Sequence, residues 1–395
     1  MCALNKVKGM GLIMYKAYRF RLYPTTNQIE LIHKTFGCTR VVYNHYLEKQ
    51  KALYDEGKDS LSCFDMIKDL KNFQVERPYL KEVDSCSLRC SLFNLDDAFK
   101  RWYKGQGEYP KFKGKYNSKR SYRTNCISST YKDKTYQSIE VDLKRHIIKL
   151  PKLKEVSIKG YRDLEYLPGR IINATIEQAS TLKYYVSVLV EEDDVYTKLK
   201  PRKIIGIDLG IKDIVITSDN EKIGNPRLIE KYEKRIKRCA RELSRRVKGS
   251  NNYNKTKKKL AVLHQKLKNA RRHFIHQITK KLVIENDIIV TESLKLKDMI
   301  EEKRLSKQLT NVSLGDLCRV LEYKAKIYGK KYIKIDSYYP SSQECSRCGY
   351  KNEKVKDLSV RSWICPECGS YHDRDYNASY NIMFEGLKKY MMELK

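Results

Sequence analysis

Up to about residue 105, apolar and polar residues first alternate as in a strand, and apolar residues then recur at the spacing of helices. "YKAYRFRLYPT" (15–25) places apolar and polar residues in turn and ends at Pro24, which predicts a strand. "TTNQIELIHKTFGCTRVVYNHYLEKQKALYDEG" then repeats apolar residues at helical spacing behind a Thr/Asn cap. "LSCFDMIKDLKNF" and "SCSLRCSLFNLDDAFKRWYKG" continue the helical pattern, so residues 26–105 are predicted to be helical.

A run of short alternating segments follows from about residue 106. "HIIKL", "EVSIKG", "ATIEQAS" and "YYVSVLVEE" each alternate over a few residues, which is typical of antiparallel strands in a small barrel or sheet. We expect the N-terminal strand to pair with them. The helices would then be an insertion in a β domain.

The C-terminal half begins after the expected linker "DDVYTKLKPRK" (193–203) and mixes buried strands with helices. "IIGIDLGIKDIVITSD" predicts a hairpin at the heart of a sheet, and two long basic helices should follow, broken near "GSNNYN". "DIIVTESL" reads as a buried strand that ends in a glutamate. A helix over "SLGDLCRVLEYKAKIYG", a strand over "KKYIKIDSYYP" and a final helix from about Asn377 complete the pattern.

Charge changes the picture towards a polyanionic partner. The 395 residues include 81 Lys+Arg against 48 Asp+Glu, a formal net charge of +33. Basic residues displace counterions from phosphates, so nucleic acid is the expected partner, with a merely solvated basic surface as the alternative. No apolar run approaches a membrane span, and the N-terminus lacks a signal-peptide core. We therefore expect a cytoplasmic protein that begins at Met1 or, where regular patterning starts, at Met14.

Basic and aromatic residues interleave most densely in "RWYKGQGEYPKFKGKYNSKRSYR" (101–123). Aromatic rings stack on bases while cations hold phosphates, although a general bias towards Lys, Ile, Tyr and Asn contributes to the pattern. The helices around 235–246 and 257–272 add a basic face. The candidate nucleic-acid contacts are Lys111, Lys113, Lys115, Lys119, Arg120, Tyr122 and Arg123.

Three acidic residues stand where strand ends and a helix start would converge: Asp208 in "IIGIDLG", Glu292 in "IIVTESL" and Asp375 in "DRDYNASYNI". Burying a carboxylate among apolar residues is costly unless a cation compensates it. Three such groups would bind Mg²⁺, and two Mg²⁺ can hydrolyse a phosphodiester. Taken singly, each acid is more often a cap or turn residue. Asp373 competes with Asp375, and Asp298 is a weaker rival of Glu292.

Four of the twelve cysteines form two C-x-x-C pairs separated by sixteen residues. This spacing is typical of a zinc ribbon, and four thiolates without an open position indicate a structural metal. Rubredoxin-like iron is the alternative metal and His372 an alternative ligand, although His372 fits ordinary polar sequence better. The predicted ligands are Cys345, Cys348, Cys365 and Cys368.

"GIDLG", "VTESL" and "HDRDYNASYNI" resemble the three split motifs of a RuvC-like (RNase H-fold) nuclease. With the cysteine pairs before the third motif, the chain resembles the TnpB (OrfB) family of transposon-encoded proteins from about residue 15 onward. "KAYRFRLYPTTNQ", "FGCTRVVYN", "YPKFKGKYNSKRSYRT" and "GRIINATIEQASTLKYYVSVLVE" also match that family. Asp375 matches the family's third acid because that acid precedes x-Asn.

The resemblance implies a multidomain α/β protein whose RNase H-like (RuvC) nuclease domain carries a zinc-ribbon insertion. A β-barrel wedge domain, interrupted by a helical recognition domain, would precede it. The implied boundaries are 1–25 and 106–200 for the wedge, 26–105 for the recognition domain, 201–340 and 373–395 for the nuclease, and 341–372 for the ribbon.

The resemblance also implies an RNA-guided DNA endonuclease related to type V CRISPR effectors. A guide RNA from the transposon end would pair with double-stranded target DNA, and Asp208, Glu292 and Asp375 would hold catalytic Mg²⁺. We expect a prokaryotic, nucleoid-associated monomer on one RNA, with a dimer left open. A DNA transposase with the same acids and a DNA-binding regulator without cleavage are the alternatives. No Walker loop or G-x-G-x-x-G motif occurs, which disfavours ATP and dinucleotide chemistry.

Overall fold

A computed structural model divides the chain into two compact units, Met1–Asp194 and Val195–Lys395. The structure describes residues 7–8, 11–116, 119–131, 134–160, 164–193, 201–210, 212–293, 314–357 and 359–394. Most of the expected linker, residues 194–200, lies outside the described residues, as does Asp298. The boundary between the units falls within that linker, while the finer domain boundaries stay predictions.

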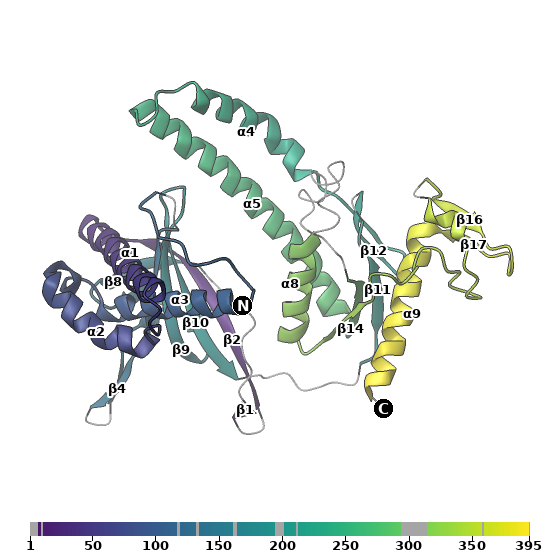
Figure 1. Cartoon of the computed structure of the whole chain (residues 1–395). Coiled ribbons are helices and arrows are strands. Elements are labelled where there is room, and N and C mark those ends of the chain that lie inside the picture. Colours follow the sequence, from purple (N-terminus) through teal and green to yellow (C-terminus); the bar gives the residue numbers. More distant parts are fainter. Residues whose placement is uncertain are drawn as a thin grey trace. The chain divides into compact units, whose positions relative to one another are not determined.

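The first unit contains an eight-stranded sheet in the order β3-β9-β10-β2-β8-β7-β6, with β1 paired to β2 (Figure 1). The expected pairing of the N-terminal strand with later strands is confirmed, because β2 runs antiparallel to β10 from Tyr184↔Leu22 to Asp193↔Ile13. Barrel closure stays a prediction, since the described pairings run from β3 to β6 without joining these two ends. The strands are β1 (Val7–Lys8), β2 (Gly11–Tyr23), β3 (Ser121–Asn125), β6 (Glu140–Asp142), β7 (Ile147–Leu150), β8 (Lys154–Lys159), β9 (Arg170–Gln178) and β10 (Tyr184–Asp193), with β4 (Ser128–Tyr131) and β5 (Lys134–Gln137) forming a separate hairpin.

Three helices lie between β2 and β3 along the chain, as the helical spacing predicted. They are α1 (Thr26–Asp55), α2 (Cys63–Glu76) and α3 (Ser85–Tyr103), with the short turn η1 (Pro78–Lys81) after α2. Thr25 and Ser62 close capping boxes that satisfy the first amides of α1 and α2. Their apolar faces share a buried core around Tyr46, Leu88 and Leu92.

The second unit is built on a five-stranded sheet in the order β13-β12-β11-β14-β15. β11, β14 and β15 are parallel, while β12 returns antiparallel to β11 as the expected hairpin. Apolar residues fill both faces of these strands, so both faces need covering. The strands are β11 (Ile204–Asp208), β12 (Asp213–Thr217), β13 (Lys222–Gly224), β14 (Ile288–Glu292) and β15 (Lys331–Ile335).

Helices cover both faces of this second sheet (Figure 1). Ile289 faces a core made with α5 (Asn251–Glu285) and α8 (Leu314–Ile327), whereas Val290 faces α9 (Arg374–Leu394). The two basic helices predicted around "GSNNYN" are α4 (Leu228–Ser244) and α5. Successive side chains of each strand therefore point alternately into the two cores. The carboxyl ends of the parallel strands β11, β14 and β15 meet at one edge of the sheet.

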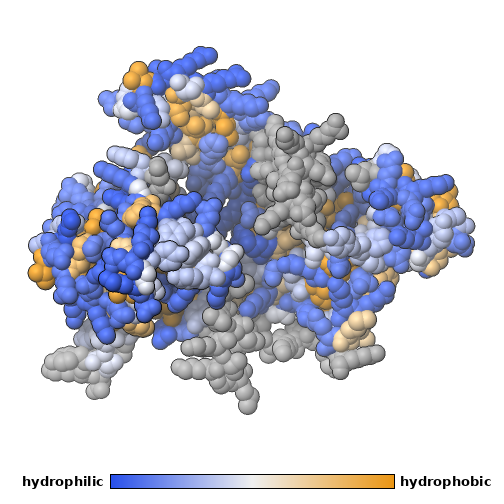
Figure 2. Space-filling model, viewed as in Figure 1, coloured by the Kyte–Doolittle hydropathy of each residue, from blue (hydrophilic) through white to orange (hydrophobic). Residues whose placement is uncertain are grey.

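The surface agrees with the charge of the chain. The face seen in Figure 2 is predominantly hydrophilic. Within the described ranges, no helix combines the length and apolarity that a bilayer-spanning segment needs.

Candidate metal centres and nucleic-acid interface

Asp208 and Glu292 end two neighbouring parallel strands in the same register. Ile207 of β11 lies opposite Thr291 of β14, so the two carboxylates occupy the next position on each strand. Parallel neighbours bring the same ends of their strands together at one edge of the sheet. The sequence expectation that these two acids meet is thus met by the strand register.

Asp375 reaches the same edge from the first turn of α9. A Cβ on Gly206 of β11 would lie 2.1 Å from the Ser379 carbonyl oxygen, so only glycine allows α9 to approach the strand this closely. α9 begins at Arg374, three residues before the predicted start, because the Asp373 carboxylate accepts the amides of Asp375 and Tyr376 at 3.0 and 3.2 Å.

This capping role separates Asp373 from its neighbour. Asp373 is also paired with Lys222 at 3.0 Å, so its oxygens already have partners. The side chain of Asp375 is 26% exposed, and its nearest described cation is Arg361 at 4.0 Å. The geometry therefore favours Asp375 over Asp373 as the third acid of the cluster.

The three carboxylates influence one another electrostatically. Burial, followed by the charges of Glu292 and Asp375, raises the pKa of Asp208 to about 7. Burial also raises the pKa of Glu292, and a hydrogen bond from Ser341 partly offsets that rise. Each side chain nevertheless keeps a partly exposed surface. Repelling carboxylates with an open side are suited to a hard divalent cation.

The acidic cluster is wider than a closed ligand shell around one ion. Among the described residues, only the four cysteines form a group of at least three His, Cys, Asp or Glu side chains whose ligand atoms all lie within 4.8 Å. The charges of Glu292 and Asp375 act on Asp208, but the three carboxylates are not grouped as closely as the four thiols. Oxygen ligands around two ions are spread more widely than ligands around one.

The predicted ribbon brings its four cysteines together. The sulfur of Cys345 lies 3.6 Å from that of Cys368, and the sulfur of Cys348 lies 3.5 Å from that of Cys365. Four thiolates about 2.3 Å from a tetrahedral zinc ion stand roughly 3.8 Å apart, so the donor set and spacing fit zinc. The same sulfurs would also suit iron. The donor set agrees with the predicted structural site.

Local backbone geometry shapes each cysteine knuckle. Gly349 and Gly369 directly follow the second cysteine of their pairs and adopt φ of 79° and 67°, which glycine tolerates. Their amides donate to the carbonyls of Cys345 and Cys365, both at 2.9 Å. The ribbon also contains η2 (Glu353–Lys356) and the hairpin of β16 (Ser362–Ile364) with β17 (Tyr371–Asp373).

His372 belongs to the ribbon core, so the prediction that it is ordinary polar sequence is wrong. Its side chain is buried against Trp363, with ring centroids 4.8 Å apart. Its Nε2 lies 3.1 Å from the Cys345 sulfur, close enough to donate a hydrogen bond to a thiolate. Strand alternation explains the position, because Trp363 and His372 are paired across the hairpin. His372 thus contacts the predicted ligand Cys345 directly.

Two asparagines of α9 tie the base of the ribbon to this helix. Asn377 donates to the Glu344 carbonyl at 2.7 Å and accepts the Ser346 amide at 3.0 Å. Asn381, one turn later, donates to the carbonyls of Ser341 and Glu344 at 2.8 and 2.6 Å. Sequence reasoning missed both asparagines and Ser341. The available signal was polar residues spaced i, i+4 on the inner face of an apolar helix.

The predicted nucleic-acid contacts occupy different environments. Lys115 is exposed, whereas Lys111 pairs with Glu108. Lys119 pairs with Glu177 at 2.8 Å, and Arg120 donates to Gln178 at 2.9 Å. These pairs lie at or near the surface, where ion pairs are weak enough for a phosphate to compete.

Two of the candidate nucleic-acid contacts, Tyr122 and Lys113, are held in place by packing. Tyr122 is only 7% exposed and packs edge-on against Phe36, so the prediction that it stacks on bases is wrong. Alternation along β3 turns it into the core and leaves Arg123 on the other, partly exposed face. The Lys113 ammonium lies 3.5 Å from the Tyr43 ring centroid, and burial lowers the pKa of Lys113 to about 8.

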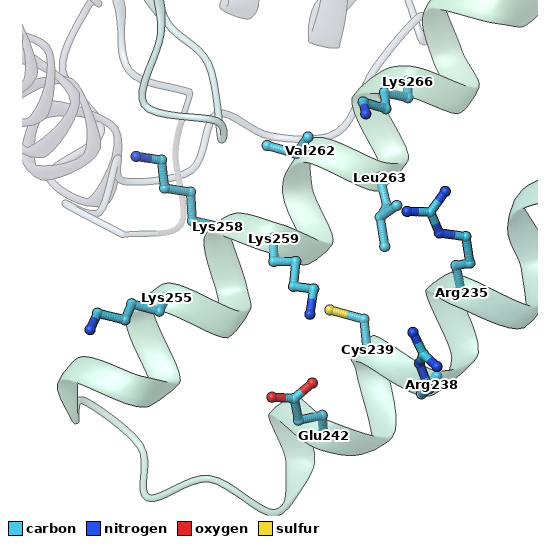
Figure 3. Close-up of a pocket in the computed structure, with 10 residues that line it drawn as sticks. All are labelled: Arg235, Arg238, Cys239, Glu242, Lys255, Lys258, Lys259, Val262, Leu263 and Lys266. Carbon is cyan, nitrogen blue, oxygen red and sulfur yellow. The ribbon is translucent and has the colours of Figure 1, made fainter.

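The basic helices α4 and α5 enclose a groove of about 410 Å³ (Figure 3). Arg235 extends towards Leu263 of the facing helix and Lys259 towards Cys239, whereas Lys255 and Lys258 point away from α4. The groove is lined by Arg235, Arg238, Cys239, Glu242, Lys255, Lys258, Lys259, Val262, Leu263 and Lys266. The single acid, Glu242, is paired with Arg246 at 3.1 Å, which leaves a cationic surface.

Sequence comparison places the chain among transposon-encoded proteins. A "Probable transposase" family model (OrfB of IS605) matches residues 187–303, a "Cas12f1-like, TNB domain" model residues 315–382, and a helix-turn-helix model of the same OrfB family residues 10–59. A "Putative RNA-guided DNA endonuclease" of Streptomyces pristinaespiralis is 30% identical over 94% of this chain and 89% of its own length. The similarly named InsQ of Escherichia coli strain K12 is 27% identical over 94% of this chain and 92% of its own length.

Solved structures show the same mixed α/β fold. A Cas12f1 effector, solved with guide RNA and target DNA, matches with a TM-score of 0.57 at 13% identity over 94% of this chain and 99% of that chain. The mini-effector Cas-phi3 matches with a TM-score of 0.50 at 11% identity over 95% of this chain and 92% of that chain. Sequence identity over nearly the full length, three matching family models and the cysteine ribbon before Asp375 agree: the chain belongs to the TnpB (OrfB) family of transposon-encoded proteins.

Proposed function

We propose that the chain is an RNA-guided DNA endonuclease. Its catalytic site for cutting target DNA would consist of Asp208, Glu292 and Asp375 in a RuvC-like domain. The observation that carries this proposal is the shared register of β11 and β14, which sets Asp208 beside Glu292. The high pKa of Asp208 supports it, because a raised carboxylate pKa in a partly open site is typical of functional clusters. The names of the full-length relatives support the same activity.

The acids would act by holding and orienting Mg²⁺ at the sheet edge. When bound, the metal pair lowers the pKa of a water molecule and stabilises the leaving oxygen of a phosphodiester. Hydrolysis joins the water oxygen to phosphorus and breaks the bond to the 3′ oxygen, which takes up a proton. The products are a 5′-phosphate and a 3′-hydroxyl. The carboxylates of Asp208, Glu292 and Asp375 must be ionised to serve as ligands.

The nucleic-acid partners are a guide RNA from the transposon end and double-stranded target DNA. The net charge of +33 and the cationic α4–α5 groove suit phosphate backbones. We assign residues 1–25 and 106–200 to a wedge domain, 26–105 to a recognition domain, and 201–340 with 373–395 to the nuclease around the 341–372 ribbon. One protein on one RNA in a prokaryotic nucleoid is the simplest assembly.

A DNA transposase that joins strands with the same acids is the second candidate. The "Probable transposase" family match over residues 187–303, which contains Asp208 and Glu292, favours considering it. The two functions differ in the nucleophile, because hydrolysis uses water and strand transfer uses a DNA 3′-hydroxyl. They differ also in whether RNA selects the DNA.

One assay separates the two candidates. The protein is purified with and without a co-expressed transcript of its flanking DNA and is offered a library of target plasmids with Mg²⁺. We expect cleavage that needs the RNA and is abolished by Asp208→Ala. Strand joining without RNA would contradict the nuclease proposal and favour the transposase.

A further inference from the structure

We propose that Ser341 is a positioning residue for Glu292, and that through it the zinc ribbon controls how tightly the acidic cluster binds divalent metal. The inference rests on the proposed role of Glu292 as a metal ligand. It concerns residues outside the three acids and the four cysteines.

The contact between Ser341 and Glu292 is direct and partly buried. Ser341 is 7% exposed, and its hydroxyl donates a hydrogen bond to Oε1 of Glu292. Glu292 ends β14, so its backbone is fixed by the sheet while its side chain keeps several rotatable bonds. A hydrogen bond to one oxygen selects a single orientation of the carboxylate. Bonds of this kind around metal ligands are typically worth about 10- to 100-fold in metal affinity.

Ser341 is itself held by α9. Asn381 is 4% exposed and donates to the Ser341 carbonyl at 2.8 Å and to the Glu344 carbonyl at 2.6 Å. Asn377, 2% exposed, donates to the same Glu344 carbonyl and accepts the amide of Ser346. Buried amides that lose such partners are costly, so segment 341–346 has one strongly preferred position.

The same segment is the start of the ribbon. Cys345 lies four residues after Ser341 and between the two residues that Asn377 binds. Its amide bonds to the Tyr350 carbonyl at 2.8 Å, and its sulfur contacts Cys368 and His372. The closed metal site therefore anchors segment 341–346 from one side while α9 anchors it from the other. Loss of the ribbon metal removes one of these anchors and frees Ser341.

Because the coupling is a free energy shared by two sites, it must act in both directions. Metal at the carboxylates should slow the loss of zinc from the ribbon, just as zinc should tighten metal binding at the carboxylates. A serine that merely caps the turn at 340–344 would affect ribbon folding without changing the affinity of the acids.

The first test compares two adjacent serines. Mn²⁺ binding is measured by electron paramagnetic resonance on the purified full-length chain, with zinc content measured alongside. We expect Ser341→Ala to weaken Mn²⁺ binding about tenfold or more, Ser341→Thr to restore it by keeping the hydroxyl, and Ser342→Ala to bind as the unaltered chain does. Equal Mn²⁺ binding by the two alanine variants would overturn the proposal.

The second test is a double-mutant cycle with Cys368→Ser, whose site is exposed and distant in sequence from segment 341–346. We expect Cys368→Ser to lose zinc, to weaken Mn²⁺ binding, and to add little when combined with Ser341→Ala, because both act through one path. Hydrogen exchange of the Ser346 amide should accelerate in Cys368→Ser. Full additivity would argue against the path. Metal binding needs no cleavage, so a chain that binds Mn²⁺ as expected but never cuts DNA would refute the nuclease alone.

Discussion

The ribbon and the acidic cluster, the two proposed metal sites, are built in opposite ways. The four cysteines lie within 24 residues, and their sulfurs lie within 4.8 Å of one another. The three acids come from two strands and a helix that are far apart in the chain, and they keep partly exposed, mutually repelling carboxylates. Soft ligands close around one ion for shape, while hard ligands stay open for a substrate.

The difference shows how much of each site depends on long-range packing. Knuckle turns need only glycines at two positions and local hydrogen bonds. The acids need the β11–β14 register and the close approach of α9 at Gly206. Changes to the sheet should therefore affect the acids first, and changes to the ribbon should reach Glu292 through segment 341–346.

The largest expected effect separates chemistry from zinc binding. Asp208→Asn removes a ligand charge, and we expect target cleavage to fall by about 10³-fold or more, equivalent to roughly 4 kcal/mol of transition-state stabilisation. Zinc content should remain that of the unaltered chain. Cleavage by guided, Mg²⁺-containing complexes measures the first quantity, and metal analysis measures the second. If Asp208→Asn still cleaved target DNA, Asp208 would not be a catalytic residue.

A second change tests the dependence of the acids on packing. In Gly206→Ala the new Cβ would meet the backbone of α9, so we expect a loss of about 3 kcal/mol in the free energy of unfolding of the second unit. Gly37→Ala is the matched control, because nothing lies within 4 Å of its Cβ and α1 should gain about 0.5 to 1 kcal/mol. Hydrogen exchange in β11 and in β2 under urea measures both. Equal stability of the two variants would contradict the close approach.

The third prediction uses the raised pKa of Asp208. Below about pH 7 this carboxyl holds a proton that a cation must displace, so we expect the affinity of the acids for Mn²⁺ to fall by about tenfold per pH unit. Without metal, the folded state binds this proton more tightly than the unfolded state does. That contribution to stability is complete below about pH 4 and is lost as pH rises through about 7. Asp208→Asn should reduce both dependences, leaving the part that comes from the raised pKa of Glu292, and calorimetry with and without Mn²⁺ checks them.

The smallest expected effect lies in the basic–aromatic segment. Lys115→Ala should weaken guide-RNA binding by less than about threefold and reduce the salt slope by about one, as for a single phosphate contact.

Tyr122→Ala should instead destabilise the first unit by about 3 kcal/mol, because its ring is in the core. Filter binding at several salt concentrations and thermal melting distinguish the two. A stable Tyr122→Ala chain with weak RNA binding would restore Tyr122 as a contact residue.

The contrast between Tyr122 and Lys115 shows what a pattern along the chain can predict. Composition identified a basic–aromatic stretch, but it did not indicate that Tyr122 would lie on the buried side of β3, whereas Lys115 precedes that strand and is exposed. His372 was misjudged for a similar reason, since its cross-strand partner Trp363 is nine residues away in sequence. Ser341 carried no signal of its own, because its role depends on Glu292 from another strand.

The sequence by itself determined the helices, most strands, the cysteine knuckles and the candidate acids, since periodicity, caps and C-x-x-C spacing are local properties. Only the tertiary structure decided that Asp373 caps α9 while Asp375 faces the cluster. It alone decided that Asn377 and Asn381 join the ribbon to Glu292 through Ser341. These choices depend on strand register and helix packing, which bring together residues that the chain keeps far apart.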